Sequence, residues 1–60
     1  MLITLERVSE LLELDVSNLD LEDQALLLGL SRDLVDKEGE EYLSQYKNLL
    51  KDEFEYLRSL

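Results

Sequence analysis

The last third of the chain has the clearest pattern of apolar and polar positions. From Glu40 to Leu60 there is no Gly or Pro, and apolar residues recur in steps of three and four. These residues are Leu43, Tyr46, Leu50, Phe54 and Leu57, with Tyr42, Leu49 and Tyr56 beside them. Because such steps place side chains on one face of a helix, we predict a helix over about residues 40–59 with a broad apolar face.

One acidic residue interrupts that face. Glu53 lies between Leu50 and Leu57, where a core residue would be expected. Its carboxylate would either reach past the edge of the face to water or pair with a Lys or Arg on a partner helix.

A short amphipathic helix is predicted near the start of the chain, over about residues 3–14. Leu5, Val8 and Leu12 share one face, and Thr4 is suited to cap the N-terminus. A helix of this length is not stable alone, so it has to pack against the other helices.

A second helix is predicted over about residues 21–37, with Asn18 or Asp20 as its N-cap and acidic residues in its first turn. Its apolar side chains cover about 200° of the helix circumference. They are Leu26, Leu27, Leu28, Leu30, Leu34 and Val35. Such a helix contacts neighbours on more than one side.

The segment around Gly39 decides whether the second and last helices are separate. Lys37 suits a helix C-terminus, and Gly39 suits the left-handed position that follows one. The centre of the apolar face also shifts from about 100° to about 210° across this segment. These signals favour a break or a sharp kink, whereas a continuous helix would keep Gly39 as an interior residue.

The predicted fold is all-α. It consists of a short N-terminal helix plus two longer helices, or one kinked long helix, that form a helical hairpin or three-helix unit. The chain has 60 residues and no Cys or His. A domain of this size buries only about 60% of its unfolded surface and is marginally stable. Disulfides and thiolate or imidazole metal sites are excluded, so we predict that oligomerisation completes the bundle, with a dimer favoured.

The chain has a formal net charge of −9, from fifteen acidic and six basic residues. This charge disfavours direct binding to nucleic acids and to anionic membranes, and it favours a protein partner with a basic surface. No apolar run approaches the length of a membrane span, and the N-terminus does not resemble a signal peptide. We therefore expect a cytoplasmic protein.

No motif in the chain predicts catalysis, a cofactor or a metal. Without His or Cys, the usual pairs of nucleophile and base are absent. Two glycines cannot form a phosphate loop or a dinucleotide fingerprint. The pairs Glu10/Glu13 and Glu38/Glu41 lack the His that diiron bundles require. The acids are instead typical of helix N-termini and solvated faces.

The sequence predicts a non-enzymatic protein–protein interaction module that acts as a regulator, adaptor or inhibitor. The alternatives are an inhibitor that imitates nucleic acid or resembles an antitoxin and occupies a basic site, and a structural subunit of a larger assembly. The predicted interface consists of the main apolar residues of the second and last helices. They are Leu26, Leu27, Leu30, Leu34, Tyr42, Tyr46, Leu49, Leu50, Phe54 and Leu57.

Overall fold

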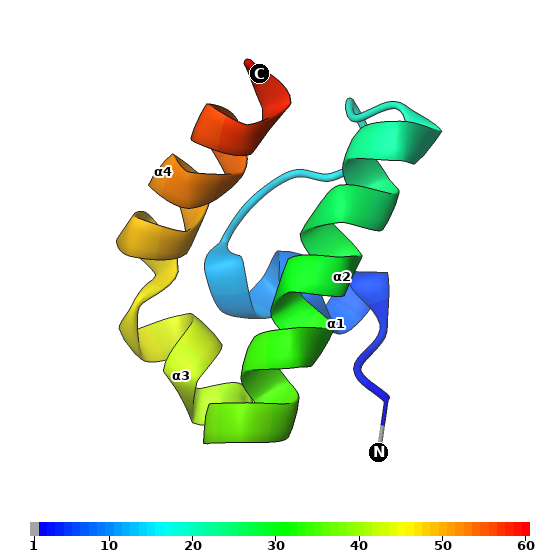
Figure 1. The fold of residues 1–60 in the computed structure, drawn as a ribbon. Helices are drawn as coiled ribbons and strands as arrows, with labels where there is room; N and C mark the ends of the chain where they lie inside the picture. Colours follow the sequence, from blue (N-terminus) through cyan, green and yellow to red (C-terminus); the bar gives the residue numbers. More distant parts are fainter. Residues whose placement is uncertain (1) are drawn as a thin grey trace.

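The computed structural model describes residues 2–60, which form helices and connecting turns. The helices are α1 (Leu5–Leu12), α2 (Leu21–Glu38), α3 (Glu40–Gln45) and α4 (Lys47–Arg58) (Figure 1). No strand occurs in this range, so the predicted all-α class is confirmed. α2 and α4 form two sides of the molecule, and α1 contacts α2, α3 and α4.

A single chain encloses its own hydrophobic core, to which every helix contributes. The buried apolar side chains are Ile3, Val8, Leu12, Leu27, Leu43, Leu50 and Phe54. The radius of gyration is 10.4 Å, which agrees with the value of about 10 Å expected for a folded domain of this length. The accessible surface of 4280 Å² is close to the roughly 4,000 Å² of a compact monomer of this mass.

α1 begins and ends with well-defined caps. The side chain of Thr4 accepts a hydrogen bond from the backbone N–H of Arg7 at 3.2 Å, as the sequence predicted. Glu13 ends the helix in the left-handed conformation, with φ 53° and ψ 46°. Leu14 N–H then donates to the Ser9 carbonyl at 3.1 Å, which closes the last turn. The Glu13 carboxylate also pairs with Lys47, so the end of α1 is tied to α4.

The segment between α1 and α2 is a turn held by side chains. Asp20 is the N-cap of α2, because its Oδ1 accepts from the backbone N–H of Asp23 at 2.9 Å. Of the two predicted caps, Asn18 does not serve this role. Gln24 donates to the carbonyls of Val16 and Leu19 at 3.2 and 3.0 Å, which fixes the turn against the start of α2.

The carboxylate of Asp15 is stabilised in its charged form. The hydroxyl and backbone N–H of Ser17 donate to its Oδ1 at 2.6 and 3.0 Å, and these bonds lower the pKa of Asp15 below its usual 3.8. Because the folded pKa is the lower one, these bonds stabilise the fold above the usual pKa and cease to do so as pH falls through the lowered value.

We expect Ser17→Ala to raise the pKa of Asp15 toward 3.8, because the variant loses the hydroxyl donor to Oδ1 and keeps only the backbone donor to that atom. NMR titration of the Asp15 carboxyl group measures this change. An unchanged midpoint would contradict the role of the hydroxyl.

The break between α2 and α3 occurs at Gly39, as the sequence favoured. Gly39 has φ 91° and ψ 167°, so its positive φ agrees with the prediction. Its ψ is extended, which corrects the expected left-handed helical conformation. This region of backbone space is accessible essentially only to glycine.

The predicted helix over residues 40–59 is divided by a turn at Tyr46, and this corrects the sequence-based expectation. Tyr46 has φ −113° and ψ 29°, which lies outside regular helix geometry. The turn changes the chain direction between α3 and α4 (Figure 1). With this change, Leu43 of α3 and Phe54 of α4 both reach the core.

Candidate functional site

Three exposed apolar side chains of the C-terminal segment, one in the turn before α4 and two on α4, lie in a row on the outer side of that helix. We call Tyr46, Leu49, Glu53 and Tyr56 the outer row. Tyr46, Leu49 and Tyr56 are 40%, 60% and 62% exposed, and Glu53 is also exposed. At about 100° per residue, steps of four and three keep Leu49, Glu53 and Tyr56, the members within α4, in an arc of about 60°.

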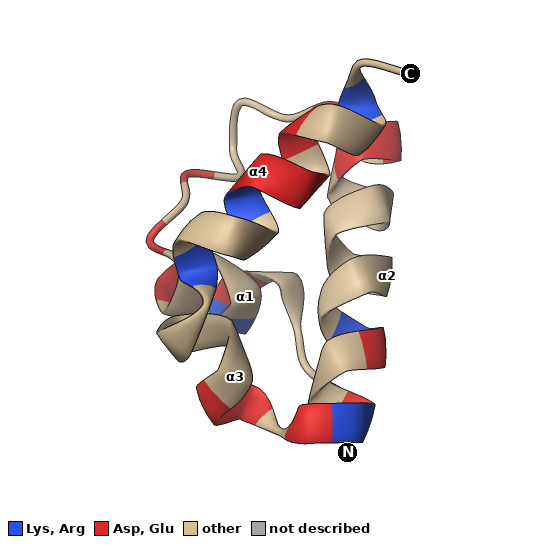
Figure 2. Ribbon diagram, turned by 60° about the vertical axis from the view of Figure 1, so that its left-hand side comes forward, with Lys and Arg blue, Asp and Glu red and all other residues tan. Residues whose placement is uncertain are grey.

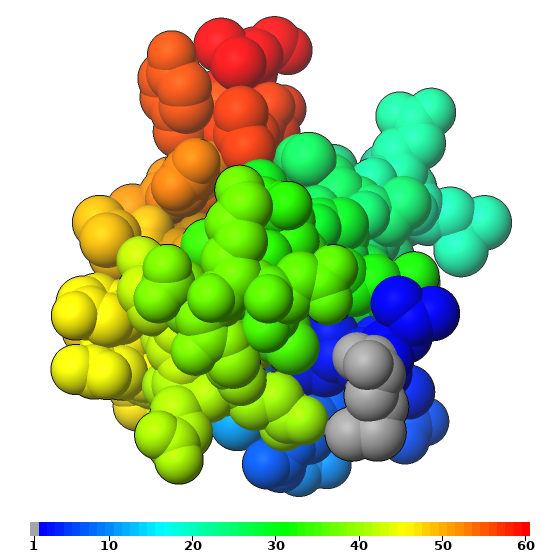
Figure 3. All heavy atoms as spheres, turned by 60° about the horizontal axis from the view of Figure 1, so that its bottom comes forward, coloured from blue at the N-terminus to red at the C-terminus, as the bar shows by residue number. Residues whose placement is uncertain are grey.

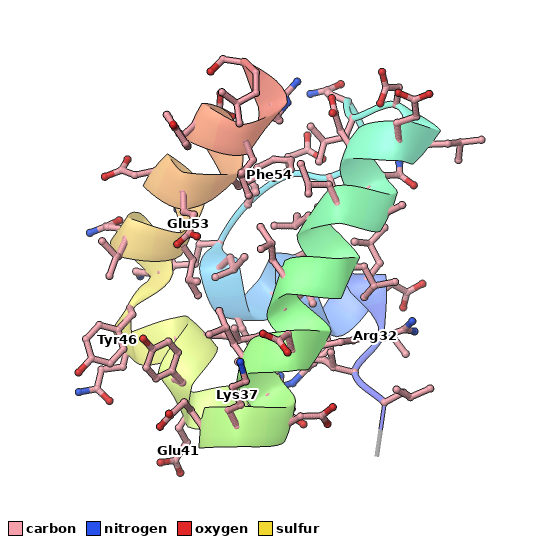
Figure 4. All side chains as sticks on the ribbon, in the orientation of Figure 1. Arg32, Lys37, Glu41, Tyr46, Glu53 and Phe54 are labelled. Atoms are coloured by element: carbon pink, nitrogen blue, oxygen red, sulfur yellow. The ribbon has the colours of Figure 1, made fainter. Side chains whose placement is uncertain are left out.

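The opposite part of α4 faces the core. Figure 4 shows Phe54 pointing from α4 toward α2, while Tyr46 lies at the outer edge of the molecule. Phe54 is 1% exposed, and the guanidinium of Arg58 lies 5.3 Å from the centre of its ring. The broad apolar face that the sequence predicted is therefore two faces, of which one is buried and one is exposed.

An aromatic pair fixes the first side chain of the outer row. The rings of Tyr42 and Tyr46 have centroids 4.5 Å apart and planes inclined by 35°. This distance lies within the range of favourable aromatic contacts. Tyr42 belongs to α3 and Tyr46 is the turn residue that follows this helix, so the pair holds the Tyr46 ring against α3.

The basic residues of α4 contact the rest of the chain. Lys47 pairs with Glu13. Arg58 contacts Asp23 at 3.1 Å and Glu55 at 3.0 Å. Partial burial disfavours the charge on Arg58, but the two carboxylates outweigh this effect and raise the pKa of its guanidinium. Figure 3 shows that the end of α4 and the start of α2, which the Arg58–Asp23 pair joins, project on the same side of the molecule.

The outward surface of α4 is left acidic. Asp52 and Glu53 form no ion pair with any residue in the range 2–60. Figure 2 shows further acidic residues at both ends of α2 and at the start of α3. The outer row thus combines exposed apolar side chains with an unneutralised carboxylate at its centre.

The structure distributes the predicted interface residues over three environments. Leu27, Leu50 and Phe54 belong to the core of the single chain and are covered by it. The half-buried residues are Leu26, Leu30, Leu34, Tyr42 and Leu57, of which the first three pack against the core. Tyr46 and Leu49 are exposed. Only the exposed residues offer a partner a substantial apolar surface without a change in the fold.

The predicted interface omitted Tyr56, which is the most exposed apolar member of the outer row. A signal for it was present, because Tyr56 follows Leu49 by seven residues, the repeat of a helix packing seam. Leu21 at the start of α2 is 82% exposed, but the exposed residues that follow it at helical spacing, Ala25 and Gly29, are small.

A shallow groove lies between α1 and α3. It has a volume of about 340 Å³ and is lined by Arg7, Leu11, Glu40, Glu41, Ser44 and Gln45. Arg7 is engaged in the wall of the groove, because its Nε donates to Glu40 at 3.0 Å and its Nη1 to Glu10 at 3.2 Å. The hydrogen bond to Glu40 is the main cause of the raised pKa of Arg7. Of the charged groups that line the groove, only Glu41 forms no ion pair within residues 2–60.

Residues 2–60 contain no group of three or more His, Cys, Asp or Glu side chains arranged to hold a metal ion. Within the same residues, no helix combines the length and the apolar character needed to cross a membrane.

The chain matches none of the protein-family models, curated proteins or solved structures with which it was compared.

Proposed function

We propose that this chain is a non-enzymatic protein–protein interaction module and that its outer row is the surface that docks on the partner. In this role the module would regulate, recruit or inhibit the protein that it binds. The proposal is supported above all by the exposed row of Tyr46, Leu49 and Tyr56 on a helix whose other face is already buried.

The composition of the row supports a binding role. Tyrosine is enriched among the residues that contribute most to protein interfaces, because it offers a large rigid surface with one polar group. The row lies on a helix that is anchored by Leu50 and Phe54 in the core. A partner would therefore meet a surface that is already ordered, which reduces the entropy lost on binding.

The acidic clusters by themselves do not favour the nucleic-acid-mimic alternative. Asp20 caps α2, and Glu22 and Asp23 lie in its first turn. Glu40 and Glu41 lie in the first turn of α3. Acids at these positions stabilise the positive end of a helix, so local structure accounts for them.

The proposal is tested by removing the apolar part of the row. The partner would first be identified by photo-crosslinking from position 49 and then purified. We expect the double variant Leu49→Ala/Tyr56→Ala to bind the purified partner at least about tenfold more weakly in calorimetry, because truncated interface anchors commonly cost about 2 kcal/mol or more.

A matched control is Leu21→Ala, which removes a leucine outside the row that is even more exposed than Leu49 and should leave the affinity unchanged. Circular dichroism should show native helicity in both variants, since exposed substitutions change stability by only about 0.5 kcal/mol. If the double variant binds as tightly as the unmodified chain, the outer row is not the docking surface.

A further inference from the structure

The centre of the outer row carries a charge that its own chain does not neutralise. Glu53 lies between Leu49 and Tyr56 along the row, and its side chain is exposed (Figure 4). The residues three and four positions away are Leu49, Leu50, Tyr56 and Leu57, none of which is basic. A partner that covers this row would bury an unpaired carboxylate, which is strongly unfavourable unless the partner supplies a counter-charge.

The nearest basic residues on α4 are not available to Glu53. Lys47, Lys51 and Arg58 lie about 100–150° from the row around the helix. Lys47 and Arg58 are ion-paired with Glu13, Asp23 and Glu55, and Lys51 lies 3.5 Å from the Glu13 carbonyl.

A second copy of this chain would not supply the missing charge. Its own row presents Glu53 at the centre, and Asp52 and Glu55 flank it on the exposed side of α4. A symmetric pair of α4 helices would therefore bring carboxylates close together in an apolar contact, which disfavours self-association through this surface.

We infer that the outer row binds an amphipathic helix of another protein that presents a Lys or Arg to Glu53. The spacing of three and four residues is that of packing between two helices. The apolar members would supply the contact area, and Glu53 would select the partner by its charge. This inference rests on the proposed function, since it identifies the chemistry of the partner at the same surface.

The test uses two synthetic helical peptides of about 18 residues with identical composition. Both carry leucines spaced to face the outer row. In one peptide a Lys faces Glu53 and a Glu lies on the solvent side, and in the other these two residues are exchanged. Because their net charges are equal, general attraction to the acidic chain does not distinguish them. Binding is measured by fluorescence anisotropy with the full chain.

We expect the unmodified chain to bind the peptide with the central Lys about tenfold more tightly than its isomer. Glu53→Lys should reverse this preference, and Glu53→Gln should abolish it. The control Glu22→Lys makes the same change in net charge at an exposed site on α2 and should keep the preference of the unmodified chain.

The failures of the two proposals are distinguishable. Equal binding of both isomers would overturn the charge selection by Glu53 while leaving the row as a docking surface. If neither isomer binds the unmodified chain or Glu53→Leu, the proposed docking surface fails as well. Sedimentation would overturn the inference if it found a dimer of the unmodified chain that Leu49→Ala/Tyr56→Ala dissociates. The molecule bound at the outer row would then be a second copy of this chain and not a helix of another protein.

Discussion

Phe54→Ala is expected to leave the chain largely unfolded. Phe54 is 1% exposed and is the largest side chain in the core. Truncation of a buried Phe costs about 3–5 kcal/mol, because apolar contacts are lost and a cavity remains. A domain of 60 residues has only about 3–9 kcal/mol of stability in total. Circular dichroism with urea or thermal denaturation should show a much weaker or absent cooperative transition.

Tyr56→Ala is the matched control for this prediction, because it removes an aromatic side chain from the same helix. Tyr56 is 62% exposed, so its loss should change stability by no more than about 0.5 kcal/mol. If Phe54→Ala melted like the unmodified chain and Tyr56→Ala did not, the inner and outer faces of α4 would be assigned the wrong way round.

Gly39→Ala should destabilise the fold by about 1–3 kcal/mol, which is the cost of a strained backbone conformation. The φ of 91° at this position is one that side chains with a Cβ rarely adopt. A Cβ at Gly39 would meet no atom within 4 Å, so the cost comes from the backbone and not from a clash. Thermal denaturation of the variant measures the change.

Gly29→Ala is the control, and we expect it to change the stability in the opposite direction. Gly29 lies inside α2, and a Cβ there would also meet no atom within 4 Å. Ala is preferred over Gly within a helix, so this variant should be stabilised by about 0.5–1 kcal/mol. Stabilisation by both substitutions would indicate that α2 and α3 form one continuous helix, contrary to the break at Gly39.

The expectation that the chain needs a second copy was based on its short length and on the wide spread of apolar residues along α2. The structure covers Leu27 within one chain and packs Leu30 and Leu34 against the same core. The compact single chain therefore removes that reason for self-association. Self-association itself stays a prediction, and sedimentation of the unmodified chain at micromolar concentration is its measurement.

Local sequence signals identified the helices and several of their ends. Thr4 was predicted as an N-cap, and Asp20 was one of the two N-caps predicted for the second helix, from their side-chain chemistry. Both accept the expected backbone hydrogen bonds. The break at Gly39 followed from the lack of a Cβ and from the shift in the apolar face on either side of it. These features depend on interactions within a few residues, which is why the sequence alone determined them.

Other features depended on how the helices pack. No Gly or Pro marks the turn at Tyr46, which brings Leu43 and Phe54 to the same core from two directions. The sequence placed Leu49 and Leu50 together on one broad face, but only the tertiary structure decided that Leu50 is buried and Leu49 exposed. Periodicity determines which side chains share a face of a helix, whereas the part of that face that is covered depends on the positions of the other helices.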